Sequence, residues 1–134
     1  MIRSYRELVV WQRSFALSIE IYKLTREFPG EELYGLTSQL RRSSVSIPSN
    51  IAEGYGRNTR RDYRNFVGIA RGSALELQTQ LAIAKELKFG EPEAMQKAQE
   101  QTEEVGKCYG HCCKSSDGSP DPCTRTPCTL SPVP

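Results

Sequence analysis

The chain has 134 residues, the length of one domain of ordinary size. Hydrophobic residues make up 37% of it and charged residues 25%, which is typical of a globular protein with a modest core. No apolar run approaches the roughly 18–20 residues that a membrane-spanning helix needs, and the N-terminal sequence MIRSYRELVVWQRS lacks the apolar core of a signal peptide. We therefore expect a cytoplasmic protein that does not enter a membrane.

Charge and cysteine are distributed unevenly along the chain. Residues 1–90 hold 14 Lys/Arg and 9 Asp/Glu, a net charge of +5, whereas residues 91–114 carry −2 and the last twenty residues carry −1. The basic body permits a polyanionic partner. All five cysteines lie in the last 27 residues, and thiols stay reduced in the cytoplasm, so we do not expect a disulfide framework.

The first predicted helix carries two apolar stripes and ends at Phe28-Pro29-Gly30, where proline and glycine favour a turn. One stripe contains Leu8, Trp11, Phe15, Ile19 and Tyr22, and the other contains Val10, Leu17, Ile21, Leu24 and Phe28. Together they are wider than one neighbouring helix needs, which indicates a helix buried in a bundle and favours a further role in a subunit interface. We interpret Trp11, Phe15 and Tyr22 as core residues rather than as a ligand-binding cluster.

The second predicted helix starts at about Glu31 and ends near Gly54 and Gly56. Its apolar line consists of Leu33, Leu36, Leu40, Ile47 and Ile51. Pro48 lies inside this helix and cannot donate a hydrogen bond to the carbonyl of Ser44, so we expect a kink. Several small residues around the proline (Ser43, Ser44, Ser46, Ser49 and Ala52) would allow another helix to approach closely.

Two more helices follow. Asn58 or Thr59 is the expected cap of the third, which runs to about Phe89 and is closed by Gly90; its apolar line is Phe66, Ala70, Ser73, Leu77, Leu81, Ala84 and Leu87. Pro92 suits the first turn of the fourth helix, whose seam is Met95, Ala98, Thr102, Val105, Tyr109 and Cys112. Short connections predict an all-α, up-down-up-down four-helix bundle over residues 1–114 with a kinked second helix. Residues 115–134, rich in Pro, Ser, Thr and Cys, are expected to be a disordered tail.

Arginines gather at the start of the third helix. Arg57, Arg60, Arg61 and Arg64 could grip a backbone phosphate, with help from the free N–H groups of the helix start. Tyr55 and Tyr63 nearby could stack on bases. The same arginines would also fit a solvated surface, ion pairs with acids of a neighbouring subunit, or contact with a protein partner.

A second polar group flanks the expected kink. It consists of Arg41, Arg42, Asn50 and Glu53, which could fix the register of the bundle or extend a binding surface. The candidate nucleic-acid-binding residues are therefore Arg57, Arg60, Arg61, Arg64, Tyr55, Arg41 and Arg42.

Residues for acid–base or metal chemistry are scarce. His111 is the only histidine, and Cys108, His111 and Cys112 could approach a metal, but their spacing matches no zinc-binding pattern. The chain contains no Walker loop, GxGxxG or GxSxG motif. We therefore predict a protein that is not an enzyme and has no catalytic residue, metal site or cofactor.

Three segments carry a family resemblance: LVVWQRS (Leu8–Ser14), SVSIPSNIAEGYGR around Pro48, and FVGIARGSALELQTQL (Phe66–Leu81). Over roughly residues 2 to 114 the chain resembles the four-helix bundle proteins of the S23 ribosomal type, which are encoded in bacteria, sometimes within intervening sequences of 23S rRNA genes. That family is similar in fold to the pentameric accessory proteins of diversity-generating retroelements, which bind nucleic acid and a reverse transcriptase. The resemblance implies a homopentamer.

These observations lead to three functional hypotheses. The first is a non-enzymatic, oligomeric RNA-binding protein associated with ribosomal RNA, which contacts phosphates through the arginines. The second is a protein-interaction scaffold, such as an accessory subunit of a reverse transcriptase. The third, a metal-dependent enzyme, requires His111 and the cysteines to hold a metal.

Overall fold

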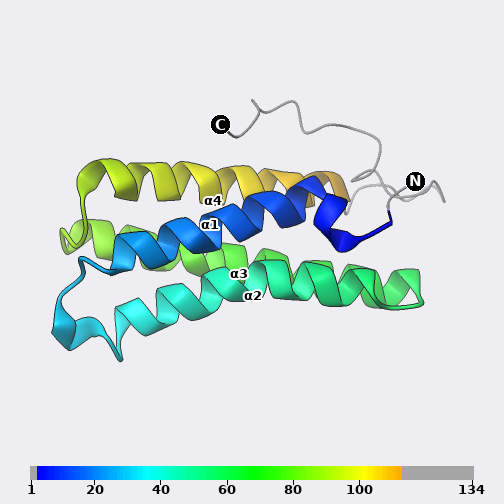
Figure 1. The fold of residues 1–134 in the computed structure, drawn as a ribbon, viewed down its shortest axis with the longest axis horizontal. Helices are drawn as coiled ribbons and strands as arrows, with labels where there is room; N and C mark the ends of the chain where they lie inside the picture. Colours follow the sequence, from blue (N-terminus) through cyan, green and yellow to red (C-terminus); the bar gives the residue numbers. More distant parts are fainter. Residues whose placement is uncertain (1–2, 113–134) are drawn as a thin grey trace.

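The protein is described here by a computed structural model, which defines residues 3–112 and side chains as far as Tyr109. Four helices follow one another along the chain: α1 (Val9–Thr25), α2 (Leu36–Tyr55), α3 (Arg60–Glu86) and α4 (Pro92–Cys112). Two short 3-10 turns, η1 (Tyr5–Glu7) and η2 (Gly30–Glu32), precede α1 and α2. The helices alternate in direction (Figure 1), and no strand occurs in this part of the chain. The predicted all-α, up-down-up-down bundle is confirmed, whereas the predicted tail lies outside the described residues.

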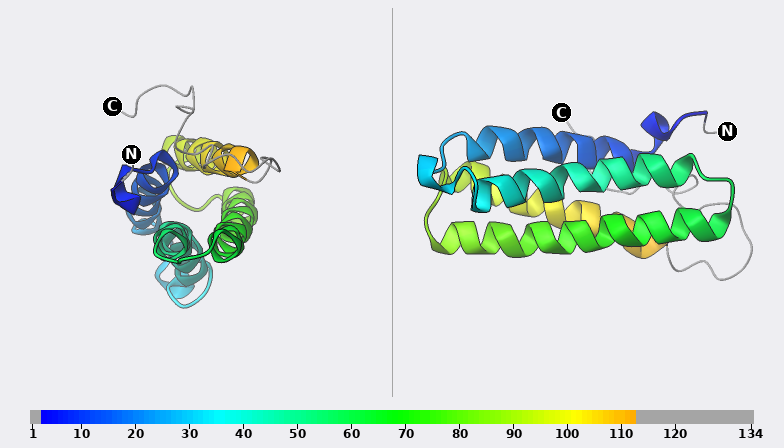
Figure 2. Two further views of the ribbon diagram at one scale, coloured as in Figure 1. Left: turned by 90° about the vertical axis from the view of Figure 1, so that its right-hand side faces the viewer. Right: turned by 90° about the horizontal axis from the view of Figure 1, so that it is seen from below.

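The four helices occupy the corners of a square when the bundle is viewed along its length (Figure 2). Helix α1 packs against α2 and α4, and α3 packs against the same two helices, so α1 and α3 are diagonal to each other. The α1/α2 side of the bundle is therefore opposite the α3/α4 side. This arrangement gives the protein two separate long faces.

The core lies along the predicted apolar lines. Leu17 and Ile21 from α1, Leu40, Ile47 and Ile51 from α2, Leu77 and Leu81 from α3, and Val105 and Tyr109 from α4 are fully buried. At the ends of two predicted lines, Leu33 and Leu87 are exposed, because Leu33 precedes α2 and Leu87 is the C-cap of α3. The side chain of Cys112 lies outside the described residues.

Of the first stripe, only Leu8, which precedes α1, is buried as expected. Phe15 is 49% exposed, Ile19 45% and Tyr22 42%, while Trp11 is half-buried against the core. The interpretation of Phe15 and Tyr22 as core residues is therefore wrong for the single chain. Periodicity finds both stripes, but α1 has only two neighbouring helices, which cover the second stripe.

The helix boundaries differ from the prediction in three places, the first of which is α1, which ends at Thr25 rather than at Phe28. Helix α2 begins at Leu36 rather than near Glu31, because Gly35 is non-helical (φ −108°, ψ −116°) and separates α2 from the turn η2. Helix α3 begins as expected after Thr59, whose Oγ1 accepts a hydrogen bond from Asp62 N at 3.1 Å. It ends at Glu86 rather than Phe89, because Lys88 adopts a positive φ of 59°.

Helix α2 continues through Pro48, and α1 compensates for the missing hydrogen bond. Proline cannot donate to the carbonyl four residues earlier, that of Ser44. The Oγ of Ser18 on α1 lies 2.8 Å from this carbonyl oxygen and donates to it. A carbonyl that would be unsatisfied inside the bundle thus becomes a contact between two helices.

We expect Ser18→Ala to lower the free energy of unfolding by about 1–2 kcal/mol, because it leaves the buried Ser44 carbonyl without this donor. Ser14→Ala is the matched control, since the Ser14 hydroxyl donates only to carbonyls of its own helix, those of Val10 and Trp11. Urea denaturation would compare the two variants. Equal losses for Ser18→Ala and Ser14→Ala would contradict a special role for the Ser44 carbonyl.

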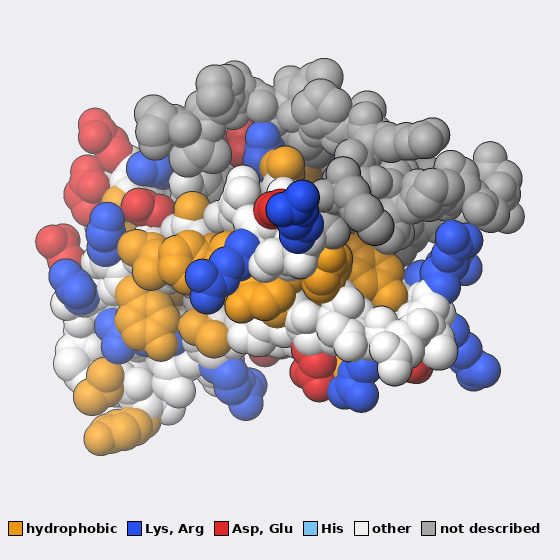
Figure 3. All heavy atoms as spheres, turned by 45° about the vertical axis from the view of Figure 1, so that its right-hand side comes forward, with side chains coloured by type: hydrophobic (Ala, Val, Ile, Leu, Met, Phe, Trp, Pro, Cys, Tyr) orange, Lys and Arg blue, Asp and Glu red, His pale blue; other side chains and the backbone are white. Residues whose placement is uncertain are grey.

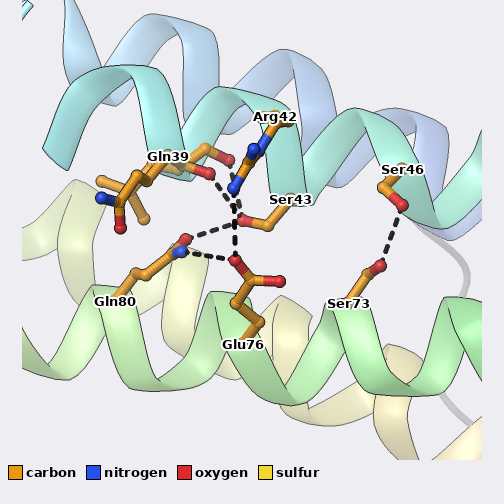
Figure 4. Close-up of polar contacts among 8 residues, drawn as sticks. Gln39, Arg42, Ser43, Ser46, Ser73, Glu76 and Gln80 are labelled. Atoms are coloured by element: carbon orange, nitrogen blue, oxygen red, sulfur yellow. Dashed lines mark hydrogen bonds and ion pairs between the residues drawn. The ribbon is translucent and has the colours of Figure 1, made fainter. Parts of the chain in front are cut away.

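A polar seam joins α2 to α3 (Figure 4). Ser43 Oγ donates to Gln80 Oε1 at 2.7 Å, and Ser46 Oγ lies 2.9 Å from Ser73 Oγ. Near the end of the seam, Gly54 allows close packing, because a Cβ there would lie 2.8 Å from Phe66 Cβ. Paired polar groups between two helices have good partners in only one register, so the seam fixes where the arginines of α3 lie relative to α2.

Candidate nucleic-acid interface

The start of α3 presents a group of arginines to solvent. Thr59 caps the helix, and Arg60, Arg61 and Arg64 are exposed in its first two turns. Within the described part of the chain, no acid lies close enough to form an ion pair with Arg60 or Arg61. The N-terminus of a helix also carries a partial positive charge and N–H donors. The site therefore combines backbone donors with exposed guanidinium groups, which suits a phosphate ligand.

Arg57 is held by the protein itself. Its Nη2 lies 2.9 Å from Glu53 Oε1, and its guanidinium carbon lies 4.9 Å from the centre of the Phe66 ring. These contacts connect the end of α2 to the second turn of α3. Arg57 is half-exposed and adds positive charge to the site, but its guanidinium group is already engaged on two sides.

Arg41 and Arg42 lie elsewhere on the bundle. Arg41 Nε donates to Thr25 Oγ1 at 2.9 Å and its guanidinium carbon lies 4.8 Å from the centre of the Tyr22 ring, while Arg42 faces Glu76 at 3.9 Å. About fourteen residues of α2 separate them from Tyr55, or ~21 Å at 1.5 Å per residue. The structure therefore does not bring Arg41 and Arg42 together with the arginines of α3.

The tyrosines and the second polar group have mainly structural contacts. Tyr55 and Tyr63 are half-buried and pack against the core, which limits the ring area that a base could cover. Asn50 Nδ2 donates to the carbonyl of Ser46 at 2.7 Å, and Glu53 pairs with Arg57. For Asn50 and Glu53, the structural interpretation accounts for the observed contacts.

Arg71 belongs to the same edge of α3 as Arg60 and Arg64, although it was not among the predicted site residues. Arg71 lies seven residues after Arg64 and eleven after Arg60, and both spacings bring a side chain back to the same side of an α-helix. It is exposed, and on α4 it has a basic neighbour, Lys107, across a shared groove. The spacing of the arginines could have revealed Arg71, whereas Lys107 required the packing of α3 against α4.

An exposed apolar surface lies along α1 and α2, on the side of the bundle opposite α3 and α4. We define the α1/α2 apolar face as the surface formed by Trp11, Phe15, Ile19, Tyr22, Val45 and Pro48. It encloses a groove of about 500 Å³. In Figure 3, apolar side chains form an elongated band with Lys and Arg side chains along its borders. A neighbouring hollow contains Arg41 and Arg42 beside Tyr22 and Val45.

The described residues provide little for catalysis. They include no group of three or more His, Cys, Asp or Glu residues that could hold a metal ion, and the side chains of His111 and Cys112 lie outside the described part. Burial raises the pKa of the Tyr109 hydroxyl well above its ordinary value, with smaller contributions from Cys108 and Tyr63, so Tyr109 stays neutral. None of the helices described is both long and apolar enough to cross a bilayer.

Comparison with known proteins identifies a similar fold and a family. A solved structure of a protein of unknown function from the S23 ribosomal protein family of Bacteroides thetaiotaomicron VPI-5482 is similar in fold, with a TM-score of 0.70 and 24% sequence identity. The similarity covers 75% of this chain and 94% of that one. No curated protein gives a significant match. The sequence profile of the 23S rRNA-intervening sequence proteins matches residues 6–111, and the chain is therefore a member of the 23S rRNA-intervening sequence protein family.

Proposed function

We propose that this protein is a non-enzymatic, cytoplasmic RNA-binding protein, associated with ribosomal RNA, that acts as a homo-oligomer. The observation that carries the proposal is the group of exposed arginines Arg60, Arg61 and Arg64 at the capped start of α3. Guanidinium groups bind phosphate through paired, planar N–H donors. Membership of the 23S rRNA-intervening sequence protein family favours RNA as the polyanion.

The α1/α2 apolar face supports the oligomer. Monomeric proteins rarely expose an apolar patch of this kind without a partner. A second copy of the chain is the occupant that we propose, and the family resemblance implies five copies. Each copy would then add one arginine group, so weak phosphate contacts would combine through avidity.

Fluorescence anisotropy with labelled 23S-derived RNA tests the proposal. We expect the triple variant Arg60→Gln, Arg61→Gln, Arg64→Gln to weaken binding by about tenfold or more, and to flatten the log–log salt dependence by ~2, because three phosphate contacts to a single strand are lost. The helicity and the oligomer size should not change. Lys23→Gln with Lys97→Gln is a control that removes exposed positive charge at the α1/α4 edge, where both lysines face Glu20.

RNA binding that is equally strong in the triple variant would overturn the arginine site. An absence of binding by the wild-type protein at low salt would overturn RNA as the ligand. In that case, the second hypothesis would stand, a scaffold on which the same arginines dock an acidic protein partner such as a reverse transcriptase. Co-purification of that enzyme with the wild-type protein, and its loss in the triple arginine variant, would support the scaffold.

A further inference from the structure

A second groove lies between α3 and α4, on the side of the bundle opposite the α1/α2 apolar face. Its volume is about 330 Å³. Arg71, Leu75 and Gln78 line it from α3, and Glu103, Gly106 and Lys107 line it from α4. We call it the α3/α4 groove. No residue of it belongs to the predicted RNA-binding set.

The side chains of the α3/α4 groove are of four chemical kinds: cationic, apolar, amide and carboxylate. Arg71 and Lys107 are exposed cations, and in the described part of the chain neither forms an ion pair, even though Glu103 lines the same groove. Leu75 is 55% exposed and provides an apolar surface. Gln78 adds an amide and Glu103 a carboxylate. A nucleotide has the matching groups: a phosphate, a flat apolar ring and a polar base edge.

The groove continues the row of arginines. Along α3, Arg60, Arg64 and Arg71 share one edge and are separated by ~6 Å and ~10.5 Å at 1.5 Å per residue. Gly68 lies between the last two, is exposed, and would have no atom within 4 Å of an added Cβ. The helix backbone is therefore bare between two arginines. A nucleic acid strand that contacts Arg60, Arg64 and Arg71 in turn would reach the α3/α4 groove, because Arg71 lines it.

We propose that the α3/α4 groove binds an unpaired nucleotide of RNA whose backbone runs along Arg60, Arg64 and Arg71; this rests on the proposed function and names its ligand class. Arg71 and Lys107 bind the adjoining phosphate, and the base lies against Leu75. A carboxylate accepts a hydrogen bond from an exocyclic amine, so Glu103 favours adenine or cytosine over uracil. A paired base cannot enter, because its edge and both its faces are occupied in the duplex.

The test compares three labelled RNA hairpins: one with a blunt stem, one with a short overhang of unpaired adenosines, and one with an overhang of uridines. We expect the wild-type protein to bind the adenosine overhang about tenfold more tightly than the blunt stem, since one stacked and hydrogen-bonded base contributes an effect of this order. The uridine overhang should give a smaller gain. Anisotropy titrations at one salt concentration provide the three affinities.

Gly106→Leu is the decisive variant, because it fills the groove and changes no charge. A Cβ at Gly106 would lie 3.6 Å from Gln78 Nε2, an ordinary contact, and Gly106 lines the groove, so a larger side chain extends into it. Leucine is also a better helix former than glycine, which protects the fold. We expect Gly106→Leu to abolish the preference for the adenosine overhang and to leave the affinity for the blunt stem unchanged.

The paired variant Arg71→Gln, Lys107→Gln should lose the same preference, while Lys23→Gln, Lys97→Gln, with an equal loss of charge, should keep it. Retention of the preference by Gly106→Leu, or its loss in the lysine control, would overturn the groove as the site. Equal wild-type binding of all three hairpins, still dependent on Arg60, Arg61 and Arg64, would overturn this inference alone. A wild-type protein that binds none of them would overturn the proposed function as well.

Discussion

Replacing Phe15 and Ile19 together with glutamate is expected to turn the proposed oligomer into monomers. Both side chains lie on the α1/α2 apolar face and are about half exposed in the single chain, so the charges are tolerated in a monomer. Between two subunits, carboxylates without partners would lose their hydration, at a cost of about 3 kcal/mol or more. The dissociation constant should rise by about a hundredfold or more. Sedimentation velocity would measure the size, and circular dichroism the helix content.

A matched pair on another face separates this effect from a general effect of charge. Ile83 and Leu87 on α3 are 47% and 54% exposed, so Ile83→Glu with Leu87→Glu places the same charges at apolar residues of similar exposure. Dissociation by the α1 pair alone would identify the α1/α2 apolar face as the contact. Dissociation by both pairs would show that the assembly also uses α3. An oligomer that withstands the α1 pair would contradict the prediction.

The α1/α2 apolar face also shows what the sequence can and cannot predict. Both stripes of α1 follow from their three- and four-residue spacing, and the four helices follow from similar lines. Spacing does not tell which stripe the neighbouring helices cover. That depends on the square arrangement, in which α1 packs mainly against α2 and α4. For this reason the spacing alone places Phe15 and Tyr22 in the core, whereas the structure exposes them and so confirms that the apolar surface of α1 is wider than its neighbours cover.

The candidate site was predictable where it is local in sequence. The cap at Thr59 and the arginines that follow it lie within six residues. The structure shows Thr59 as the cap and these arginines exposed in the first two turns of α3, as their sequence predicts. Side-chain partners from other helices were not predictable. Arg41 is bound to Thr25 on α1 and Arg42 faces Glu76 on α3, which assigns both to the surface between helices rather than to the arginine group. Lys107 lies beside Arg71 only because α4 packs against α3.

Replacement of glycine by alanine is expected to have opposite effects on the free energy of unfolding at two positions. We expect Gly90→Ala to lower the free energy of unfolding by about 2–3 kcal/mol, because of both conformation and packing. Gly90 has a φ of 76°, in the left-handed region that disfavours alanine, and an added Cβ would lie 2.8 Å from Leu24 Cδ1 and 3.0 Å from Phe28 Cε1. For a domain of this size the melting temperature should fall by about 10 °C.

Gly68→Ala is the matched control, since the change is chemically identical. Gly68 lies within the exposed surface of α3 with no atom within 4 Å of the added Cβ. Alanine is the better helix former, so the free energy of unfolding should rise by about 0.5–1 kcal/mol. Thermal denaturation followed by circular dichroism measures both variants. A fall in stability for Gly68→Ala would mean that α3 is constrained there by a contact within the protein or its assembly. If Gly90→Ala left the free energy of unfolding unchanged, the α3–α4 connection would be free to adapt. The close packing of Gly90 against Leu24 and Phe28 would then not fix how α4 returns along the bundle.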